Sequence, residues 1–391
     1  MLPFEKALEI VLSNARSLPT EHVNIKNAAN RILAEDVKSD IDIPSFDKSA
    51  MDGFACRRTD LGGELKVVEI IPAGKAPEKT IGKNECAKIM TGAVVPAGAD
   101  CVVMKEYVET LTENTVRFIG EKTAENIRYK GEDIKAGEIV LLKGTILRSQ
   151  HIAVLASAGN EQPLVSVRPK VGVVATGDEL VQVGTQPGPS QIRNSNTLQL
   201  AVQVENTGAI LKDYGIIKDR TDEIDRLIKK ALEENDVLII SGGVSVGDFD
   251  FVPGVLRQNN IDLLFEKIAI KPGKHMVFGV SEKAFCFGMP GNPVSVFVLF
   301  EILVKPFIYK LMGHNYRPVN IRMPLDEPLL NKETKRQRWL PVVITEKGTV
   351  KPVEYHGSAH INALCGANGL ICMHTGVSHL EKGSLIPIWL I

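Results

Sequence analysis

The spacing of hydrophobic residues divides the chain into parts of different character. Apolar residues recur at helical spacing from Phe4 to Ala15, and Pro19 follows the end of this pattern. Between residues 66 and 147, short runs of β-favouring residues alternate with turns such as Pro72-Ala-Gly74. The first part of the chain is therefore predicted to be a helical segment followed by a small, mostly β lobe.

The middle of the chain alternates strands and helices. Lys170–Thr176 and Asp236–Ser241 are continuous apolar runs, typical of strands buried on both faces of a parallel sheet. Helices are predicted at Asn196–Asn206 and Thr221–Glu234. The other elements predicted here are strands at Ile210–Tyr214, Leu264–Ile270, Met276–Val280 and Ala284–Gly288, and a helix from Pro293 to about Leu311. This order predicts a doubly wound α/β domain with right-handed crossovers.

The last part of the chain returns to β character. Strand-like runs at Trp339–Thr345, Val350–Tyr355, Gly369–Met373 and Ser384–Leu390 are separated by glycine turns. This pattern predicts a small β-barrel or sandwich. We expect three units: a β-rich N-terminal region (1–165), the α/β domain (166–315) and the C-terminal β domain (316–391).

Composition excludes several classes of protein. The 391 residues carry a formal net charge of −1, so the chain has no global positive field for a nucleic-acid backbone. No secretory signal and no apolar run long enough for a bilayer is apparent. The six cysteines form no C-x-x-C pair and are interpreted as dispersed, buried thiols in a reducing cytosol. We therefore expect a soluble cytoplasmic protein.

Three loops follow predicted strands of the middle domain. They are Thr176-Gly-Asp-Glu179, Ser241-Gly-Gly-Val-Ser-Val-Gly-Asp248 with Asp250 beyond it, and Pro290-Gly-Asn-Pro293. In open α/β sheets ligands bind at the carboxyl ends of the strands, and glycines let a backbone approach an anion closely. Each loop alone is better interpreted as an ordinary turn, whereas three in one domain favour a site.

Lys271-Pro-Gly-Lys274 adds two cations on a fixed turn. Alone, this motif is better interpreted as a solvated turn. Beside glycine-rich loops it suits a phosphate or another oxyanion.

The N-terminal region has weaker candidates. Asp52, in Ser49-Ala-Met-Asp-Gly53, is either an exposed acid or a turn former. Thr91-Gly-Ala93 offers a hydroxyl group, and Arg128–Asp133 is equally well interpreted as a surface salt-bridge turn. His356 and His360 are four residues apart, but the intervening Gly357 and Ser358 make a helical zinc pair unlikely. The acids suit Mg²⁺ better than zinc.

Seven motifs in chain order resemble one known family. They are Pro44–Phe54, Met90–Ala93, Gly131–Ile134, Thr176–Leu180, Ser241–Gly247, Ile270–Lys274 and Pro290–Ser295. Together they resemble the molybdopterin molybdenumtransferases, the MoeA proteins, which include the E domain of gephyrin. The resemblance implies a middle domain similar to the MogA-like adenylyltransferase and a small C-terminal β-barrel.

The resemblance also implies an activity. Such enzymes take adenylylated molybdopterin and molybdate, require Mg²⁺, and yield molybdenum cofactor with release of AMP. They form homodimers in which the N-terminal region of one subunit completes the site on the middle domain of the other. The adenylyltransferase of the preceding step is an expected partner, and neither nucleic acid nor membrane is.

The same resemblance assigns roles to residues of this chain. Catalytic roles fall to Asp52, Asp133, Glu179, Asp219, Asp250, Lys271 and Lys274. Substrate or cofactor contacts fall to Thr91, Thr176, Gly177, Gly242, Gly243, Ser245, Pro290, Gly291, Asn292, Pro293, Ser295 and Arg336. Metal contacts fall to Asp178, Glu179 and Asp250.

The chain departs from the family pattern at two places. His275 stands where the family usually has a second proline, and its imidazole is expected to point away from the pocket. Residues Lys335–Trp339 match the arginine-bearing segment of the family's C-terminal domain only loosely. Within them, Arg336 is the best candidate for an additional molybdate contact.

Two other functions compete with molybdenum insertion. One is an adenylyltransferase that acts one step earlier, and the Asp52 and Asp133 motifs argue against it because a middle domain alone would not need them. The other is a non-catalytic scaffold like gephyrin, and the intact Lys271, Lys274 and Glu179 argue against it.

Overall fold

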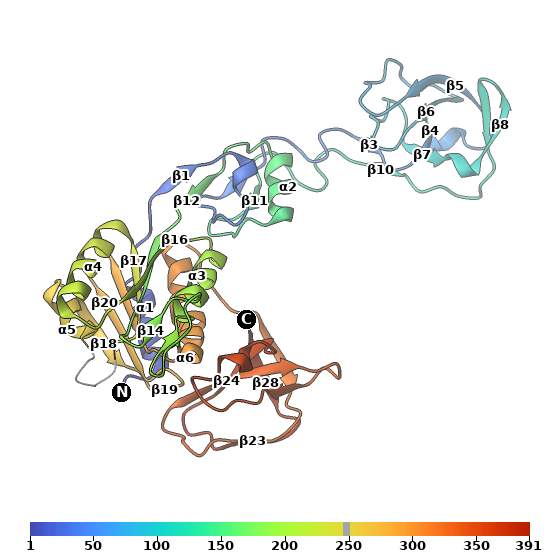
Figure 1. Cartoon of the computed structure of the whole chain (residues 1–391). Coiled ribbons are helices and arrows are strands. Elements are labelled where there is room, and N and C mark those ends of the chain that lie inside the picture. The colour runs from blue at the N-terminus through green and yellow to red at the C-terminus, as the bar shows by residue number, and fades with distance from the viewer. Residues whose placement is uncertain (245–250) are drawn as a thin grey trace.

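A computed structural model describes residues 1–244 and 251–391. Figure 1 shows an elongated molecule in which a central α/β domain and a C-terminal β domain lie next to each other. A small β lobe lies at the far end of a slender connecting segment. The predicted fold class, α/β with β-rich units on either side in sequence, is confirmed.

The central domain is built on a six-stranded sheet with the order β16-β13-β17-β21-β20-β18. Its strands are β13 (Lys170–Thr176), β16 (Ile210–Ile217), β17 (Val237–Ser241), β18 (Asp262–Lys267), β20 (His275–Val280) and β21 (Phe285–Met289). The first four in sheet order are mutually parallel, whereas β20 is antiparallel to both of its neighbours. A short parallel pair, β14 (Leu180–Val181) and β15 (Ile192–Arg193), lies outside this sheet.

The antiparallel strand β20 departs from the predicted succession of right-handed crossovers. Only four residues, Ser281 to Ala284, join β20 to β21, and the Ser281 N–H donates to the Ala284 carbonyl at 2.9 Å. A parallel crossover needs a dozen or more residues, so a connection this short forces a hairpin. The sheet is therefore doubly wound over its parallel part and ends in an antiparallel hairpin and edge strand.

Helices cover both faces of the central sheet. One face packs against α1 (Phe4–Ser13), α3 (Asn196–Asn206), α6 (Pro293–Leu299) and α7 (Lys305–Leu311), with a π-helical turn at Phe300–Val304 between the last two. The other face packs against α4 (Thr221–Glu234) and α5 (Val252–Gln258). Because both faces are buried, the inner strands β13, β17 and β21 are predominantly apolar runs, whereas the edge strands β16 and β18 carry charged residues. The sequence analysis missed α5, which contains the weak helix formers Pro253 and Gly254.

The lobe at the far end contains a second six-stranded sheet, with the order β7-β4-β6-β5-β9-β8. Its strands are β4 (Gly53–Cys56), β5 (Glu64–Ile71), β6 (Glu85–Ile89), β7 (Cys101–Met104), β8 (Val108–Thr112) and β9 (Thr115–Phe118). Three cysteines predicted to be dispersed lie on adjacent strands, and the Sγ atoms of Cys56 and Cys101 are 3.8 Å apart. Sequence spacing did not show this proximity, because sheet register creates it.

The connecting segment is a separate small unit with its own core. It contains β1 (Thr20–His22), β2 (Val37–Lys38), β11 (Ile139–Leu141), β12 (Leu164–Ser166) and α2 (Ser149–Ser157). The short pair β3 (Lys48–Ser49) and β10 (Ile127–Arg128) lies beside the lobe (Figure 1). The run at 139–142 was predicted to belong to the lobe, but β11 pairs with β2 instead. Leu141 buries its side chain with Leu33, Leu147 and Leu155 in this unit, and α2 was not predicted.

The C-terminal domain forms a small closed β structure. The strands are β22 (Asn320–Pro324), β23 (Leu329–Leu330), β24 (Gln337–Ile344), β25 (Val350–Pro352), β26 (Gly369–Met373), β27 (His379–Leu380) and β28 (Leu385–Leu390). A short strand of the central domain, β19 (Ile270–Lys271), joins the edge of this sheet. The main sheet has the order β19-β24-β26-β28-β22, and β25 pairs with β24. A bridge between Leu325 and Val350 joins the end of β22 to β25 and closes the ring, as a small barrel requires.

Short 3₁₀ helices complete the secondary structure at Ile25–Asn27, Arg58–Asp60, Lys105–Tyr107 and Ile361–Leu364. None of the helices in the described ranges combines the length and hydrophobicity that a membrane-spanning segment needs.

Phe307 of α7 provides a test of the central core. It is fully buried, and its ring lies 4.8 Å, 5.3 Å and 5.8 Å from the rings of Phe285, Phe287 and Phe278. We expect Phe307→Ala to lower the free energy of unfolding by about 3–5 kcal/mol, because it leaves a cavity among these rings. Urea unfolding followed by far-UV circular dichroism would measure the shift.

The matched control is Tyr107→Ala in the lobe, where the side chain is half exposed. It should change the same transition by less than about 0.5 kcal/mol. Equal effects of the two substitutions would contradict the assignment of Phe307 to the core.

Candidate functional site

A cavity of about 280 Å³ lies where the central domain meets the C-terminal domain. The central domain contributes Lys271, Lys274, His275, Pro290, Asn292 and Ser295 to its lining. The C-terminal domain contributes Arg336, Tyr355, Gly357 and Ser358. The structure thus gathers six of the predicted site residues around one cavity, and it places His275 among the lining residues, although its imidazole was expected to point away.

The two lysines are presented by a tight turn after β19. Gly273 in this turn has a φ of 104°, and a Cβ at this position would lie 2.9 Å from Leu299 Cγ, so the turn favours glycine. The Ile268 N–H donates to the Lys274 carbonyl at 3.0 Å and closes the turn. Lys271 and Lys274 are thereby held at the mouth of the cavity on backbone that has little freedom.

Pairing between the two domains brings Arg336 to the same cavity. Strand β19 is parallel to β24, with Ile270 opposite Gln337 and Lys271 opposite Arg338. A second link joins the Val294 N–H of α6 to the Ser358 carbonyl at 3.0 Å. These backbone contacts fix the C-terminal wall of the cavity relative to the lysine turn.

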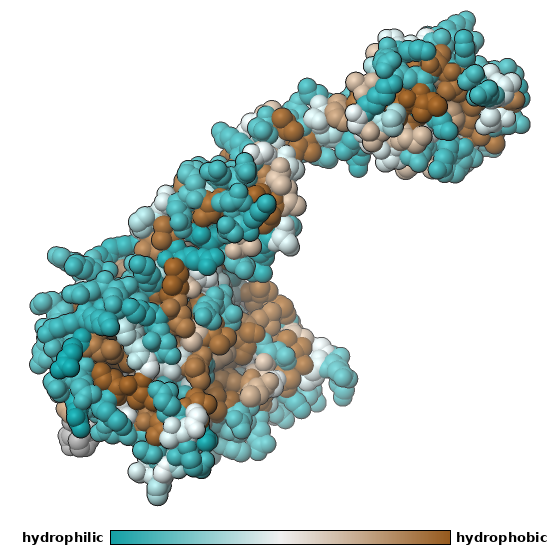
Figure 2. Space-filling view, turned by 45° about the horizontal axis from the view of Figure 1, so that its top comes forward, coloured by the Kyte–Doolittle hydropathy of each residue, from teal (hydrophilic) through white to brown (hydrophobic). Residues whose placement is uncertain are grey.

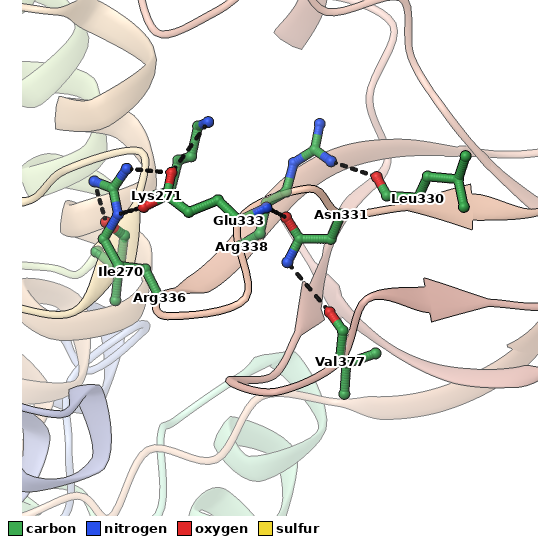
Figure 3. A network of polar contacts seen from close by, with 8 residues as sticks. All are labelled: Ile270, Lys271, Leu330, Asn331, Glu333, Arg336, Arg338 and Val377. Carbon is green, nitrogen blue, oxygen red and sulfur yellow. Dashed lines mark hydrogen bonds and ion pairs between the residues drawn. The ribbon is translucent and has the colours of Figure 1, made fainter.

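Glu333 binds two of the three cations. Its carboxylate accepts hydrogen bonds from Arg336 Nε at 2.6 Å and Nη2 at 2.7 Å, and it lies 3.6 Å from Lys271 Nζ (Figure 3). Arg336 Nη1 donates to the Ile270 carbonyl at 3.4 Å. The hydrogen bonds from Arg336, together with the positive charges of Arg336 and Lys271, hold the pKa of Glu333 at about 2. Glu333 is therefore ionised at neutral pH.

Three loops meet at the carboxyl ends of β13, β17 and β21, as predicted. Gly242 has a φ of 101°, and a Cβ there would lie 2.2 Å from the Thr176 carbonyl oxygen, so the second loop approaches the first too closely for a side chain. Asn196 Nδ2 donates to Ser241 Oγ and to the Gly291 carbonyl, both at 2.8 Å, and so joins the second loop to the third.

The first loop carries acids in two different settings. Thr176 Oγ1 donates a hydrogen bond to Asp219, which lies after β16. The Asp178 side chain is 70% exposed and lies 4.0 Å from Lys218 Nζ. The Glu179 carboxylate lies over Gly177, where a Cβ would be 2.6 Å from Oε2. Ser245 and Asp250, predicted to join this group, lie outside the described residues.

The N-terminal candidates form a separate group beside the lobe. Asp52 Oδ1 accepts hydrogen bonds from the Thr91 N–H and hydroxyl group, both at 2.8 Å, and Lys105 Nζ lies 3.5 Å from Oδ2. The hydrogen bonds from Thr91 are the main reason that the pKa of Asp52 is lowered. The Asp133 N–H donates to the Ile43 carbonyl in the adjacent segment. Figure 1 shows this region far from the central domain, so one copy of the chain does not unite the two groups.

Comparison with known proteins accounts for the whole arrangement. Residues 2–159 match a family model described as MoeA N-terminal region (domain I and II), residues 172–310 one described as probable molybdopterin binding domain, and residues 326–391 one described as MoeA C-terminal region (domain IV). A molybdopterin molybdenumtransferase of Staphylococcus epidermidis is 37% identical over 98% of this chain and 94% of its own length. This chain belongs to the MoeA family.

Further relatives agree with membership of the MoeA family. A molybdopterin molybdenumtransferase of Staphylococcus aureus is 35% identical over 99% of this chain and 95% of its own length. The crystal structure of the molybdopterin biosynthesis MoeA protein from Pyrococcus horikoshii superposes with a TM-score of 0.87 at 30% identity, and the match covers 100% of both chains. The agreement extends over all three units of the fold.

The structure of this MoeA chain adds residues that the sequence analysis missed. Glu333 and Asn196 resemble a surface acid and a helix-start residue in the sequence, and only the fold shows what they contact. Tyr355 and Ser358 lie in the β-rich tail without a recognisable motif. Across 1–244 and 251–391, no three side chains of His, Cys, Asp and Glu converge as a metal-binding group.

The ionisation of Glu333 gives a pH-dependent prediction. The pKa of Glu333 is lowered from 4.5 to about 2, so its contribution to stability is fully present above the ordinary value and is lost as the pH falls through the lowered one. We expect the stability difference between the wild-type chain and Glu333→Gln to be constant near neutral pH and to shrink below about pH 4.5. Urea unfolding at a series of pH values would measure this difference.

Glu381→Gln is the control, because Glu381 is an exposed acid of the same domain outside the cavity. It should give no comparable pH-dependent difference. A Glu333→Gln difference that stays the same down to about pH 3 would contradict the ionisation assigned to Glu333.

Proposed function

We propose that this chain is a molybdopterin molybdenumtransferase that inserts molybdate into adenylylated molybdopterin and releases AMP. The observation that carries the proposal is the cavity in which Lys271, Lys274 and Arg336 converge. Three cations against the single carboxylate of Glu333 leave a net charge that matches a divalent oxyanion. Full-length similarity to the staphylococcal molybdopterin molybdenumtransferases supports the choice of molybdate.

The cavity residues bind and orient the oxyanion in this proposal. Lysine and arginine donate charge-assisted hydrogen bonds, and the Arg336 guanidinium adds a planar fork that suits two oxygens of one anion. The buried hydroxyl group of Ser295 supplies a neutral donor at the start of α6. Because these groups are held before the anion arrives, they stabilise its charge with little reorganisation.

The strand-end loops are proposed to bind the pterin phosphate and its nucleotide. Gly242 and Gly243 of the second loop are proposed to lie against the phosphate, and Thr176 and Gly177 come from the neighbouring strand end. Ser245 is proposed as a further contact. Pro290, Gly291, Asn292 and Pro293 form the third side, and Pro290 and Asn292 also line the oxyanion cavity. The molybdate and phosphate sites would therefore be adjacent.

Carboxylates of the first loop are proposed to hold Mg²⁺. Asp178 and Glu179 provide the oxygen donors that Mg²⁺ prefers, and Asp250 is the third acid of the proposal. Bound there, Mg²⁺ would offset the negative charge of the phosphoanhydride. Asp219 would act through Thr176, whose hydroxyl group it holds.

A second copy of the chain is proposed to complete the site. Asp52, Thr91 and Asp133 lie beside the lobe and are remote from the cavity in one copy (Figure 1). Hydrophobic side chains are also exposed on the surface of the central domain. Figure 2 shows part of this surface. On α3, Leu198 and Val202 are 50% and 57% exposed and share one helix face. A symmetric homodimer would cover this face and bring the lobe of each copy to the other's cavity.

The central prediction concerns Lys274. Purified protein with adenylylated molybdopterin, Mg²⁺ and molybdate should release AMP, and omission of molybdate should slow the release. Lys274→Ala removes one cavity cation and should raise the molybdate concentration for half-maximal rate by roughly tenfold or more, because charge-assisted bonds are worth about 1.5–3 kcal/mol. An AMP assay at graded molybdate would measure this change.

Lys283→Ala is the matched control, because Lys283 is an exposed lysine of the β20–β21 turn. It should leave the molybdate dependence unchanged. AMP release that is independent of molybdate in the wild-type chain would refute the insertion reaction.

The homodimer leads to a complementation experiment. Asp52→Asn and Lys274→Ala place their lesions in opposite halves of the proposed site, so each variant alone should have little activity at a molybdate concentration far below the half-maximal concentration of Lys274→Ala. In a mixed dimer one of the two sites regains both native residues, and random exchange should restore about a quarter of the wild-type activity. Activity after mixing and subunit exchange would be compared with that of each variant alone.

Mixing Lys274→Ala with Lys271→Ala is the control, because both lesions lie in the same half and no native site can form. If the Asp52 and Lys274 variants exchange subunits but do not complement each other, the proposal that two copies share one site is wrong.

A further inference from the structure

The donors of Arg336 are divided between the protein and the cavity. A guanidinium has five N–H donors in a fixed planar arrangement. Glu333 accepts from Nε at 2.6 Å and from Nη2 at 2.7 Å, and the Ile270 carbonyl accepts from Nη1 at 3.4 Å. These contacts use three donors. Within the described ranges, the second N–H of Nη1 and the second N–H of Nη2 donate to no protein acceptor.

The contacts that are made determine where the remaining edge of Arg336 points. The two hydrogen bonds with Glu333 are parallel, so they fix both the position and the plane of the guanidinium. The Ile270 carbonyl belongs to β19, next to the lysine turn, and it restrains the other side of the group (Figure 3). The Arg336 side chain is only 18% exposed, and the residue lines the cavity.

We propose that Glu333 is a positioning residue for oxyanion binding, which holds Arg336 so that its Nη1–Nη2 edge faces the cavity. Glu333 does not itself line the cavity, and it acts through Arg336. The inference rests on the proposed function, because the oxyanion is taken to be molybdate. It assigns a role in oxyanion binding to a residue of the C-terminal domain that lies behind the cavity wall.

Glu333 has two opposing effects on an incoming anion. Its hydrogen bonds with Arg336 present two donors to the anion, which favours binding. Its negative charge, 3.6 Å from Lys271 Nζ, disfavours an anion in the same cavity. When Arg336 is present the positioning effect should dominate, and when Arg336 is absent only the unfavourable charge remains. The sign of the effect of Glu333→Gln should therefore depend on Arg336.

Titration of the full-length chain with sodium molybdate alone would test this dependence. Four proteins are compared by calorimetry: wild type, Glu333→Gln, Arg336→Ala and the double variant. We expect Glu333→Gln to weaken molybdate binding about tenfold in the wild-type background, since a bidentate carboxylate is replaced by an amide with one acceptor oxygen. In the Arg336→Ala background the same substitution should tighten binding about two- to threefold, because it removes an exposed negative charge.

Two control measurements separate positioning from loss of structure. Glu381→Gln, which removes an exposed acid outside the cavity, should leave molybdate binding unchanged. Thermal unfolding of each variant would show that the chain is folded under the titration conditions. A general structural role for Glu333 predicts weaker binding in both backgrounds, which would overturn the proposal.

The remaining outcomes are also decisive. Tighter binding by Glu333→Gln in both backgrounds would make Glu333 a counter-ion only and would overturn the positioning role. Unchanged binding in the wild-type background would have the same consequence. Failure of the wild-type chain to bind molybdate would instead refute the molybdate cavity itself, so failure of the proposed function is recognised by the wild-type titration alone.

Discussion

The cavity depends on the pairing of two short stretches of backbone, β19 and β24. Strand β19 leads directly into the lysine turn, and Arg336 lies immediately before β24, so their parallel pairing brings cations of two domains together. Like charges at such short range repel each other, and the fold places Glu333 between them. Repulsion among three unpaired cations would destabilise this region. The carboxylate of Glu333 reduces the repulsion and leaves the cavity with a net positive charge.

The central sheet supplies the other half of the site through a similar constraint. Helices bury both faces of β13, β17 and β21, so the polar loops can only emerge at the strand ends. There the loops touch closely enough that Gly242 leaves no room for a side chain against Thr176. Asn196, at the start of α3, joins two of these loops through its amide. The geometry of the strand ends therefore follows from packing well below the surface.

In a single copy of the chain, the candidate residues beside the lobe are remote from the lysine cavity. Asp52 and Thr91 form a well-defined pair, and hydrogen bonds favour the ionised form of the acid, yet nothing in the same copy brings this pair to the lysines. A connecting segment with its own small core separates the two regions. The homodimer proposed above would bring the two groups together, and it would cover the exposed face of α3.

The sequence by itself determined most elements of the central domain and the candidates in its loops. Buried strands such as β13, amphipathic helices such as α4 and the Lys271–Lys274 turn depend on residues that are near one another in the chain, and local patterns therefore predict them. The sequence patterns did not predict that β20 and β21 form a hairpin or that β11 belongs to the connecting segment. The partner of a strand depends on the whole fold and not on the residues of that strand alone. Only the tertiary structure decided that Glu333 and Arg336 meet Lys271, that Asn196 joins two loops, and that Asp52 lies far away. The physical reason is that side-chain chemistry is encoded locally, whereas distances between remote segments are set by how domains pack and pair.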